Sequence, residues 1–222
     1  MKIVNCLVQK PDLTKVAKAA QTGELIVMPT DTVYGIATTP FSPASVQALL
    51  KAKGRGSSMP PPVLVPTVSN ALELVDPRLS KQRQAFEALA EQFWPGPLTL
   101  IVDANPELTW DLGQTHGTVA LRQPDHPVAL ALLDLAGPLA VTSANVTAKP
   151  PATTVSQAYE YFGGSVSYYL DAGPSPSGMP SSIVKLTRTE PQEAKMLRQG
   201  GISFAQIQAC LAKADVMCHR EV

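Results

Sequence analysis

The chain has 222 residues, 45% of them hydrophobic, and its 18 basic side chains balance 18 acidic ones. This size suffices for one domain with a sizeable core, and the zero net charge argues against a protein that coats nucleic acid. Three cysteines, at positions 6, 210 and 218, are too few and too badly spaced for a disulfide framework. Because no apolar run approaches the ~20 residues of a membrane span, we expect a cytoplasmic protein without a membrane partner.

Apolar patterns and capping residues predict short helices and strands that alternate in the first two thirds of the chain, with strands clustered later. The predicted helices cover about residues 13–21, 43–52, 80–93, 127–135, 157–162 and 204–212. The predicted strands cover about residues 24–28, 63–65, 98–102, 118–121, 139–142, 168–170, 183–186 and 196–197. Twenty-one prolines are spread between these elements and indicate rigid turns. The pattern favours one α/β domain with a mixed sheet over residues 1–212 and a loosely held tail over 213–222.

Polar loops directly follow several of the apolar strands, which is where open α/β sheets bind ligands. The first loop, PTDTVYGIA, presents Thr32 among other hydroxyls and one carboxylate; the alternative is a turn that caps the next element. The second, KAKGRGSSMPPP, carries Lys53 and Arg55. On an extended loop these two side chains point the same way, and together they suit a polyphosphate. The alternative for this loop is a solvated run of charges.

Two further loops carry hydrogen-bonding side chains. In TVALRQPDHP, Arg122 ends an apolar strand with Thr118 on the same face, and a simple salt bridge is the alternative. In TSANVTAKPPATT, Ser143 and Asn145 are uncharged groups that could orient a ligand. A nucleophilic Ser143 is disfavoured because the sequence has no G-x-S-x-G motif, and its three histidines suggest no triad. No second pair of metal ligands accompanies the Cys-His near the C-terminus, so we expect no metal site.

The segments PTDTVYGIA, KGRG with MPPPVLV, FWPGPLTLIV, TVALRQPDHPVALALL, TSANVTAKPPATT, LDAGPSPSGMPSSIV and LRQGGI resemble, in this order, the Sua5/YrdC/YciO family. The resemblance covers about residues 13–202. It implies a YrdC-like twisted mixed β-sheet flanked by helices, with a large positively charged cleft. The KGRG and WDLGQTHGTVALR segments are similar to the actinobacterial branch, and the length is similar to that of the short, single-domain members.

The resemblance also implies an activity, that of an L-threonylcarbamoyladenylate synthase, which is a nucleotidyltransferase. Such an enzyme makes threonylcarbamoyl-AMP and pyrophosphate from L-threonine, bicarbonate or CO2, and ATP, with Mg2+ carried on the ATP. The product serves t6A modification of tRNA, so the implied partners are the downstream t6A transferase complex and a weak contact with tRNA or double-stranded RNA.

Roles for single residues follow from the resemblance, motif by motif. Lys53 and Arg55 are implied as catalytic. The implied ATP-binding residues are Lys53, Arg55, Met59, Thr118, Ser143, Asn145 and Arg198. The implied threonine-binding residues are Thr32, Arg122 and Ser181, with Arg122 binding the substrate carboxylate.

The sequence departs from the family pattern at several positions, namely Gly56, Met59, Leu64, Pro180 and Lys185. The last two replace acidic residues, which changes the local charge. Two alternatives to the synthase follow. One is a YciO-like paralogue that binds nucleotide or double-stranded RNA without making the adenylate. The other is a carbamoyl-adenylate domain of the hydrogenase-maturation type, which the absence of zinc-finger cysteines disfavours.

Overall fold

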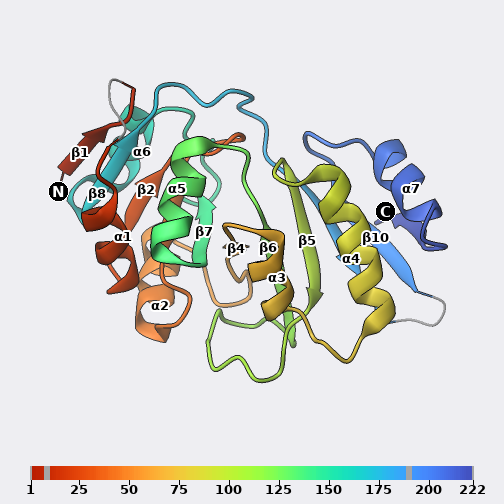
Figure 1. Ribbon diagram of the computed structural model, residues 1–222. Helices are drawn as coiled ribbons and strands as arrows, with labels where there is room; N and C mark the ends of the chain where they lie inside the picture. The colour runs from red at the N-terminus through yellow and green to blue at the C-terminus, as the bar shows by residue number, and fades with distance from the viewer. Residues whose placement is uncertain (1, 8–10, 189–191, 222) are drawn as a thin grey trace.

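The computed structural model describes residues 2–7, 11–188 and 192–221, and these form one mixed sheet flanked by helices (Figure 1). The strands follow the order β1-β8-β2-β3-β7-β4-β6-β5-β9-β10-β11 across the sheet. They are β1 (Lys2–Asn5), β2 (Ile26–Met28), β3 (Gly35–Thr38), β4 (Val63–Leu64), β5 (Leu98–Asp103), β6 (Thr118–Arg122), β7 (Leu139–Ser143), β8 (Tyr168–Asp171), β9 (Ser182–Leu186), β10 (Glu193–Arg198) and β11 (Met217–Arg220). The helices are α1 (Thr14–Gln21), α2 (Pro43–Lys53), α3 (Val68–Leu74), α4 (Ser80–Phe93), α5 (Pro127–Ala136), α6 (Val155–Phe162) and α7 (Phe204–Ala212).

Local sequence signals account for the ends of several helices. Helix α2 begins where the Ser42 side chain accepts a hydrogen bond from the Ser45 N–H, with Pro43 in the first helical position. It ends at Gly54, which adopts the left-handed conformation that glycine tolerates best. Helix α7 opens with the expected capping box between Ser203 and Gln206.

The two faces of the sheet are covered differently. On one face, α2 and α6 at one end and α3, α4 and α7 at the other pack onto a continuous hydrophobic core. On the other face, α1 and α5 pack onto each other and onto β2, β3, β4, β7 and β8. Among the described helices none covers this second face over β5, β6, β9, β10 and β11. We call that uncovered area the open face of the sheet.

The α/β class and the mixed sheet that the sequence predicts are confirmed, and most predicted elements lie within two residues of the observed ones. The sequence missed β1, β3, α3 and β11. The tail expected over 213–222 is wrong in one respect, because β11 pairs in parallel with β10 and Cys218 is buried there. The β1 and β11 strands form the two edges of the sheet, and the chain termini therefore lie at opposite ends of the molecule (Figure 1).

Among the described residues, no helix has both the length and the apolar character that crossing a membrane requires.

Candidate active site

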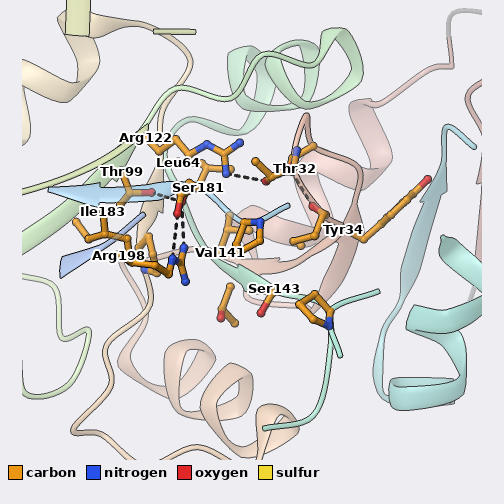
Figure 2. A pocket seen from close by; sticks show the side chains of 18 of the residues that line it. Thr32, Tyr34, Leu64, Thr99, Arg122, Val141, Ser143, Ser181, Ile183 and Arg198 are labelled. Atoms are coloured by element: carbon orange, nitrogen blue, oxygen red, sulfur yellow. Dashed lines mark hydrogen bonds between the residues drawn. The ribbon is translucent and has the colours of Figure 1, made fainter. Parts of the chain in front are cut away.

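A cavity of about 330 Å³ lies on the open face of the sheet, beside the area that α1 and α5 cover. Its floor consists of apolar side chains from neighbouring strands: Leu64, Ile101, Ala120, Val141 and Ile183. Its charged lining residues are Arg55, Arg122 and Arg198, and no acidic residue is among those that line it. Figure 2 shows Arg122 and Arg198 on different sides of the cavity, with Ser181 between them. The arrangement suits a ligand that carries negative charge at more than one point.

Arg122 is held on one side of the cavity by three hydrogen bonds. Its Nε donates to the Gly96 carbonyl at 3.0 Å, its Nη1 to Thr32 Oγ1 at 2.9 Å, and its Nη2 to Asp31 Oδ1 at 2.6 Å. Burial lowers the pKa of Arg122, and the Asp31 carboxylate opposes that shift. Because a guanidinium has five N–H donors, two remain for a ligand after these three bonds. Thr32 and Arg122, predicted together, are therefore in direct contact.

Ser181 and Arg198 meet on the other side. Arg198 donates from Nε to the Ser181 carbonyl at 3.0 Å and from Nη2 to Ser181 Oγ at 3.2 Å. The Ser181 hydroxyl also lies 2.8 Å from Thr99 Oγ1 (Figure 2). Burial lowers the pKa of Arg198. Gly200 permits this packing, because a Cβ there would lie 2.1 Å from the Pro180 carbonyl oxygen.

Arg55 and Ser143 form a third part of the lining. Arg55 Nη1 makes a long hydrogen bond of 3.4 Å to Thr142 Oγ1, and its buried Nε has no partner among the described residues. A buried N–H without a partner costs roughly 1–3 kcal/mol, so a ligand that satisfied it would be stabilised. Arg55 is thus held loosely compared with Arg122.

The expectation of an extended loop is wrong for Lys53, which is the last residue of α2 and is followed by Gly54 in the left-handed conformation. The side chains of Lys53 and Arg55 nevertheless contact neighbouring residues of β7, namely Ser143 and Thr142. Lys53 is fully buried and does not line the cavity. Its Nζ donates to the Ser143 carbonyl at 2.5 Å and to Asn145 Oδ1 at 2.9 Å. Burial, with a smaller contribution from Arg55, lowers the pKa of Lys53 to about 7.

Three other predicted residues also lie outside the cavity lining. Asn145 is buried, and its amide donates to the carbonyls of Val146 and Lys149. Thr118, at the start of β6, donates to the Thr115 carbonyl. Met59 is exposed on the loop after Arg55. Their contacts with ATP, like that of Lys53, stay predictions.

The structure also adds residues to the site that were not among the predicted ones. Asp31 orients Arg122, and Thr99 contacts Ser181. A signal existed for each: Asp31 is the one carboxylate in its hydroxyl-rich loop, and Thr99 is a polar residue inside an apolar strand. Thr30 lies 2.9 Å from the Thr32 hydroxyl and completes this side.

The loop that carries Arg55 rests on the segment before β6. The Gln114 N–H donates to the Ser57 carbonyl at 2.8 Å. Gly113 has φ +100°, and a Cβ there would lie 2.6 Å from the Ser57 carbonyl oxygen. Glycine is therefore required at 113 for both its conformation and its close approach.

Within the described residues, no group of three or more His, Cys, Asp or Glu side chains is placed to hold a metal ion. The three cysteines are free thiols.

Comparison with known proteins identifies the fold and the family. A family model for Sua5, YciO and YrdC, described as telomere recombination, matches residues 18–200. A protein of Mycobacterium tuberculosis (strain H37Rv), provisionally named threonylcarbamoyl-AMP synthase, is 47% identical over 189 residues, which cover 85% of this chain and 84% of that protein. The threonylcarbamoyl-AMP synthase of Bacillus subtilis is 33% identical over 93% of this chain and 58% of its own length.

Solved structures agree with this match. Sua5 of P. abyssi, in a complex with L-threonine, superposes with a TM-score of 0.85 at 28% identity over 99% of this chain. This chain spans 63% of that protein. YciO of E. coli, at 18% identity and a TM-score of 0.78, shares the fold. The chain belongs to the Sua5/YciO/YrdC family.

Proposed function

We propose that the chain is an L-threonylcarbamoyladenylate synthase, a nucleotidyltransferase that joins L-threonine, bicarbonate or CO2, and ATP. The observation that carries this proposal is the cavity itself, in which three arginines and several hydroxyls converge without an acidic lining residue. Such a site suits a carboxylate and a polyphosphate bound together. The 47% identity to a mycobacterial relative provisionally named as this synthase supports the same reaction.

The chemistry needs no nucleophile from the protein. The threonine ammonium first loses a proton to solvent. The amine nitrogen then adds to the carbon of CO2, one C–O π bond shifts its electron pair to oxygen, and a second proton passes from nitrogen to solvent, which gives a carbamate. A carbamate oxygen then attacks the α-phosphorus of ATP. The bond from that phosphorus to the bridging oxygen breaks, and pyrophosphate leaves with the electron pair. The protein contributes by positioning the reactants and stabilising the charge that develops.

The Arg122 side of the cavity is proposed to bind threonine. The two free N–H donors of Arg122 would bind the substrate carboxylate, while Asp31 and Thr32 keep the guanidinium in place. Ser181, across the cavity, would hydrogen-bond the amino acid from the other side.

Arg55, Ser143 and Arg198 are proposed to bind ATP, with Met59 and Thr118 as outer contacts. Arg55 and Arg198 would neutralise phosphate charge. Lys53 and Asn145 would act through Ser143, because the Lys53 ammonium binds the Ser143 carbonyl inside the protein. Mg2+ would enter on the ATP as part of the substrate, since the cavity lining offers no carboxylate to hold it.

The remaining parts of the proposal concern the protein's surroundings. The adenylate would pass to a t6A transferase complex, with tRNA or double-stranded RNA as a weak contact. The cytoplasm, where ATP and tRNA are found, is the proposed location.

The decisive experiment is pyrophosphate release from ATP by the purified protein. Release should require both threonine and bicarbonate, and serine should replace threonine poorly. Pyrophosphate release that does not depend on threonine would contradict the synthase activity. Nucleotide binding without pyrophosphate release would favour a YciO-like binding protein.

Arg55→Ala should lose about 2 kcal/mol of transition-state stabilisation, because it removes a charge-assisted contact with phosphate. The readout is kcat/KM for ATP. Lys51→Ala is the matched control, because Lys51 is an exposed cation on the same helix end. Equal activity of both variants would remove Arg55 from the phosphate site.

A further inference from the structure

A row of basic side chains crosses the open face of the sheet next to the cavity. In the antiparallel pair of β9 and β10, Lys195 lies directly opposite Lys185. In the parallel pair of β10 and β11, His219 lies beside Lys195. Since residues paired in register share one face, all three side chains lie on the same face of the sheet. Their neighbours Val184, Ala194 and Cys218 point the other way and are buried.

The strand register connects this row to the cavity. Ile101 of β5 pairs with Lys185, and Ile101 lines the cavity. In the adjacent row, Thr99, Ile183 and Arg198 are paired with one another, and all three line the cavity. A β-bulge between Met196 and Arg198 interrupts the register there, and bulges often re-aim side chains beside active sites. Lys185 and Lys195 therefore lie at the rim of the cavity, as the next pair along β9 and β10 after Ile183 and Arg198.

The two lysines of this row differ from His219, which lies 4.0 Å from the Glu193 carboxylate. No described carboxylate lies within ion-pair distance of Lys185 or Lys195. Glu193, which alternates onto this face with Lys195, faces His219 instead, and the Asp103 carboxylate pairs with Arg188 and accepts from Gln82 of α4. Like charges directly opposite each other destabilise a sheet, so folding alone gives no reason for this pair. The chain as a whole has no basic excess that would explain it by chance.

The volume of the cavity points to a ligand for this row of basic side chains. About 330 Å³ is near the lower end of the range of ~300–1,000 Å³ that pockets offer one drug-sized ligand. The proposed reaction assembles both threonine and ATP, so part of the nucleotide must extend beyond the cavity. We propose that Lys185 and Lys195, with Arg198, form a rim subsite for the terminal phosphates of ATP and for the pyrophosphate product. This inference rests on the proposed function.

A different reading treats the two lysines as surface charges that keep an uncovered sheet near its edge from pairing with other chains. The two readings differ in ligand affinity. Surface charges that only protect the sheet would leave pyrophosphate binding unchanged when they are neutralised, whereas a subsite would lose affinity.

The test uses the full chain with Lys185→Gln and Lys195→Gln combined. Calorimetric titration with pyrophosphate should give a Kd about tenfold higher than that of the unchanged protein, and the difference should shrink with added salt. In the synthase assay, with threonylcarbamoyl-AMP measured by chromatography, the variant should raise KM for ATP and weaken inhibition by pyrophosphate. KM for threonine should stay unchanged, because Arg122 lies on the other side of the cavity.

Lys213→Gln is the matched control, since it removes one exposed lysine beside α7, on the covered face. It should change none of these values. An unchanged Kd for pyrophosphate in the double variant would overturn the subsite. So would the finding that Lys185 and Lys195 contribute to binding of an RNA duplex but not of pyrophosphate. The titration contains no threonine or bicarbonate, so it reports on the subsite even if the chain makes no adenylate. Conversely, if the protein forms the adenylate but the double variant binds pyrophosphate with an unchanged Kd, the proposed function stands and the subsite is wrong.

Discussion

Lys53 ties the end of α2 to the loop after β7. Its ammonium binds the Ser143 carbonyl and the Asn145 side chain, and its own carbonyl accepts hydrogen bonds from the N–H and hydroxyl of Thr147, both at 2.9 Å. A buried amine without such acceptors would be strongly destabilising. The four bonds therefore make Lys53 a cross-link that sets where Ser143 stands relative to Arg55.

Lys53→Met keeps most of the apolar stem but leaves the buried Asn145 Oδ1 without its partner, whereas the Ser143 carbonyl still accepts from the Asn145 N–H at 2.9 Å. We expect the free energy of unfolding to fall by about 1–3 kcal/mol, the cost of one unpaired buried polar group. Denaturant unfolding measures this loss. Lys51→Met, two residues earlier and exposed, should be neutral. Similar stabilities of the two variants would contradict the cross-link.

The same variant carries a pH signature. Because burial lowers the pKa of Lys53 to about 7, the unfolded chain, with its ordinary value, binds more protons between pH 7 and about 10.5. The contribution of Lys53 to stability should therefore rise with pH across that window, by up to about 1.4 kcal/mol per pH unit. The difference in unfolding free energy between the unchanged protein and Lys53→Met should follow this rise. A difference that stays constant from pH 7 to 9.5 would place the pKa of Lys53 elsewhere.

At the scale of elements, the site depends on the contact between the loop that carries Arg55 and the segment before β6. The segment from Gly54 to Pro62 connects α2 with β4 and carries Arg55, and its Ser57 carbonyl accepts from the Gln114 N–H. Stacking of Phe41 on Trp110, with ring centroids 5.8 Å apart, holds the supporting segment to the turn before α2. The backbone of the loop that carries Arg55 is therefore supported by the segment before β6.

Gly113→Ala should displace the loop that carries Arg55, because the new Cβ would meet the Ser57 carbonyl oxygen. Since small misplacements near a reacting group have large effects, we expect KM for ATP to rise about tenfold, with KM for threonine little changed. Steady-state kinetics with each substrate varied in turn measures both.

Gly117→Ala is the control for this variant. Gly117 also has a positive φ, +77°, but an added Cβ would meet nothing within 4 Å. Both variants should lose about 1 kcal/mol of stability from backbone strain, while the effect on ATP should belong to Gly113 alone. Equal kinetic effects would mean that strain, and not the Ser57 contact, is responsible.

At the scale of the whole molecule, a sheet with one fully covered face and one half-covered face creates the site. The covered face supplies the continuous core, whereas the open face provides the floor of the cavity and the basic row beside it. Strand β11 extends that sheet at its C-terminal edge, where Val216 and Cys218 are buried against the α7 side.

Val216→Ala should therefore lower the free energy of unfolding by about 2 kcal/mol, because it removes buried methyl groups. Met217→Ala, at the next and exposed position, should change stability by less than about 0.5 kcal/mol. Thermal or denaturant unfolding compares the pair. Two neutral substitutions would mean that the end of the chain is held as loosely as its composition suggests.

The sequence by itself determined the features that depend on neighbours along the chain. Caps and prolines defined helices such as α2 and α7, apolar runs defined the central strands, and the ordered motifs indicated Thr32, Arg122 and Ser181, which line one cavity. Strands as short or as exposed as β1 and β11 gave little signal, since their pairing partners lie far away in the chain.

Only the tertiary structure decided which charged side chains are buried and which of them lie next to one another. It buried the Lys53 side chain at the end of α2, where Gly54 in the left-handed conformation ends the helix. It also placed Lys185 opposite Lys195, a juxtaposition that depends on strand register. Burial and register are non-local properties: they follow from how distant segments pack, and a one-residue shift in pairing would move each side chain to the other face of the sheet.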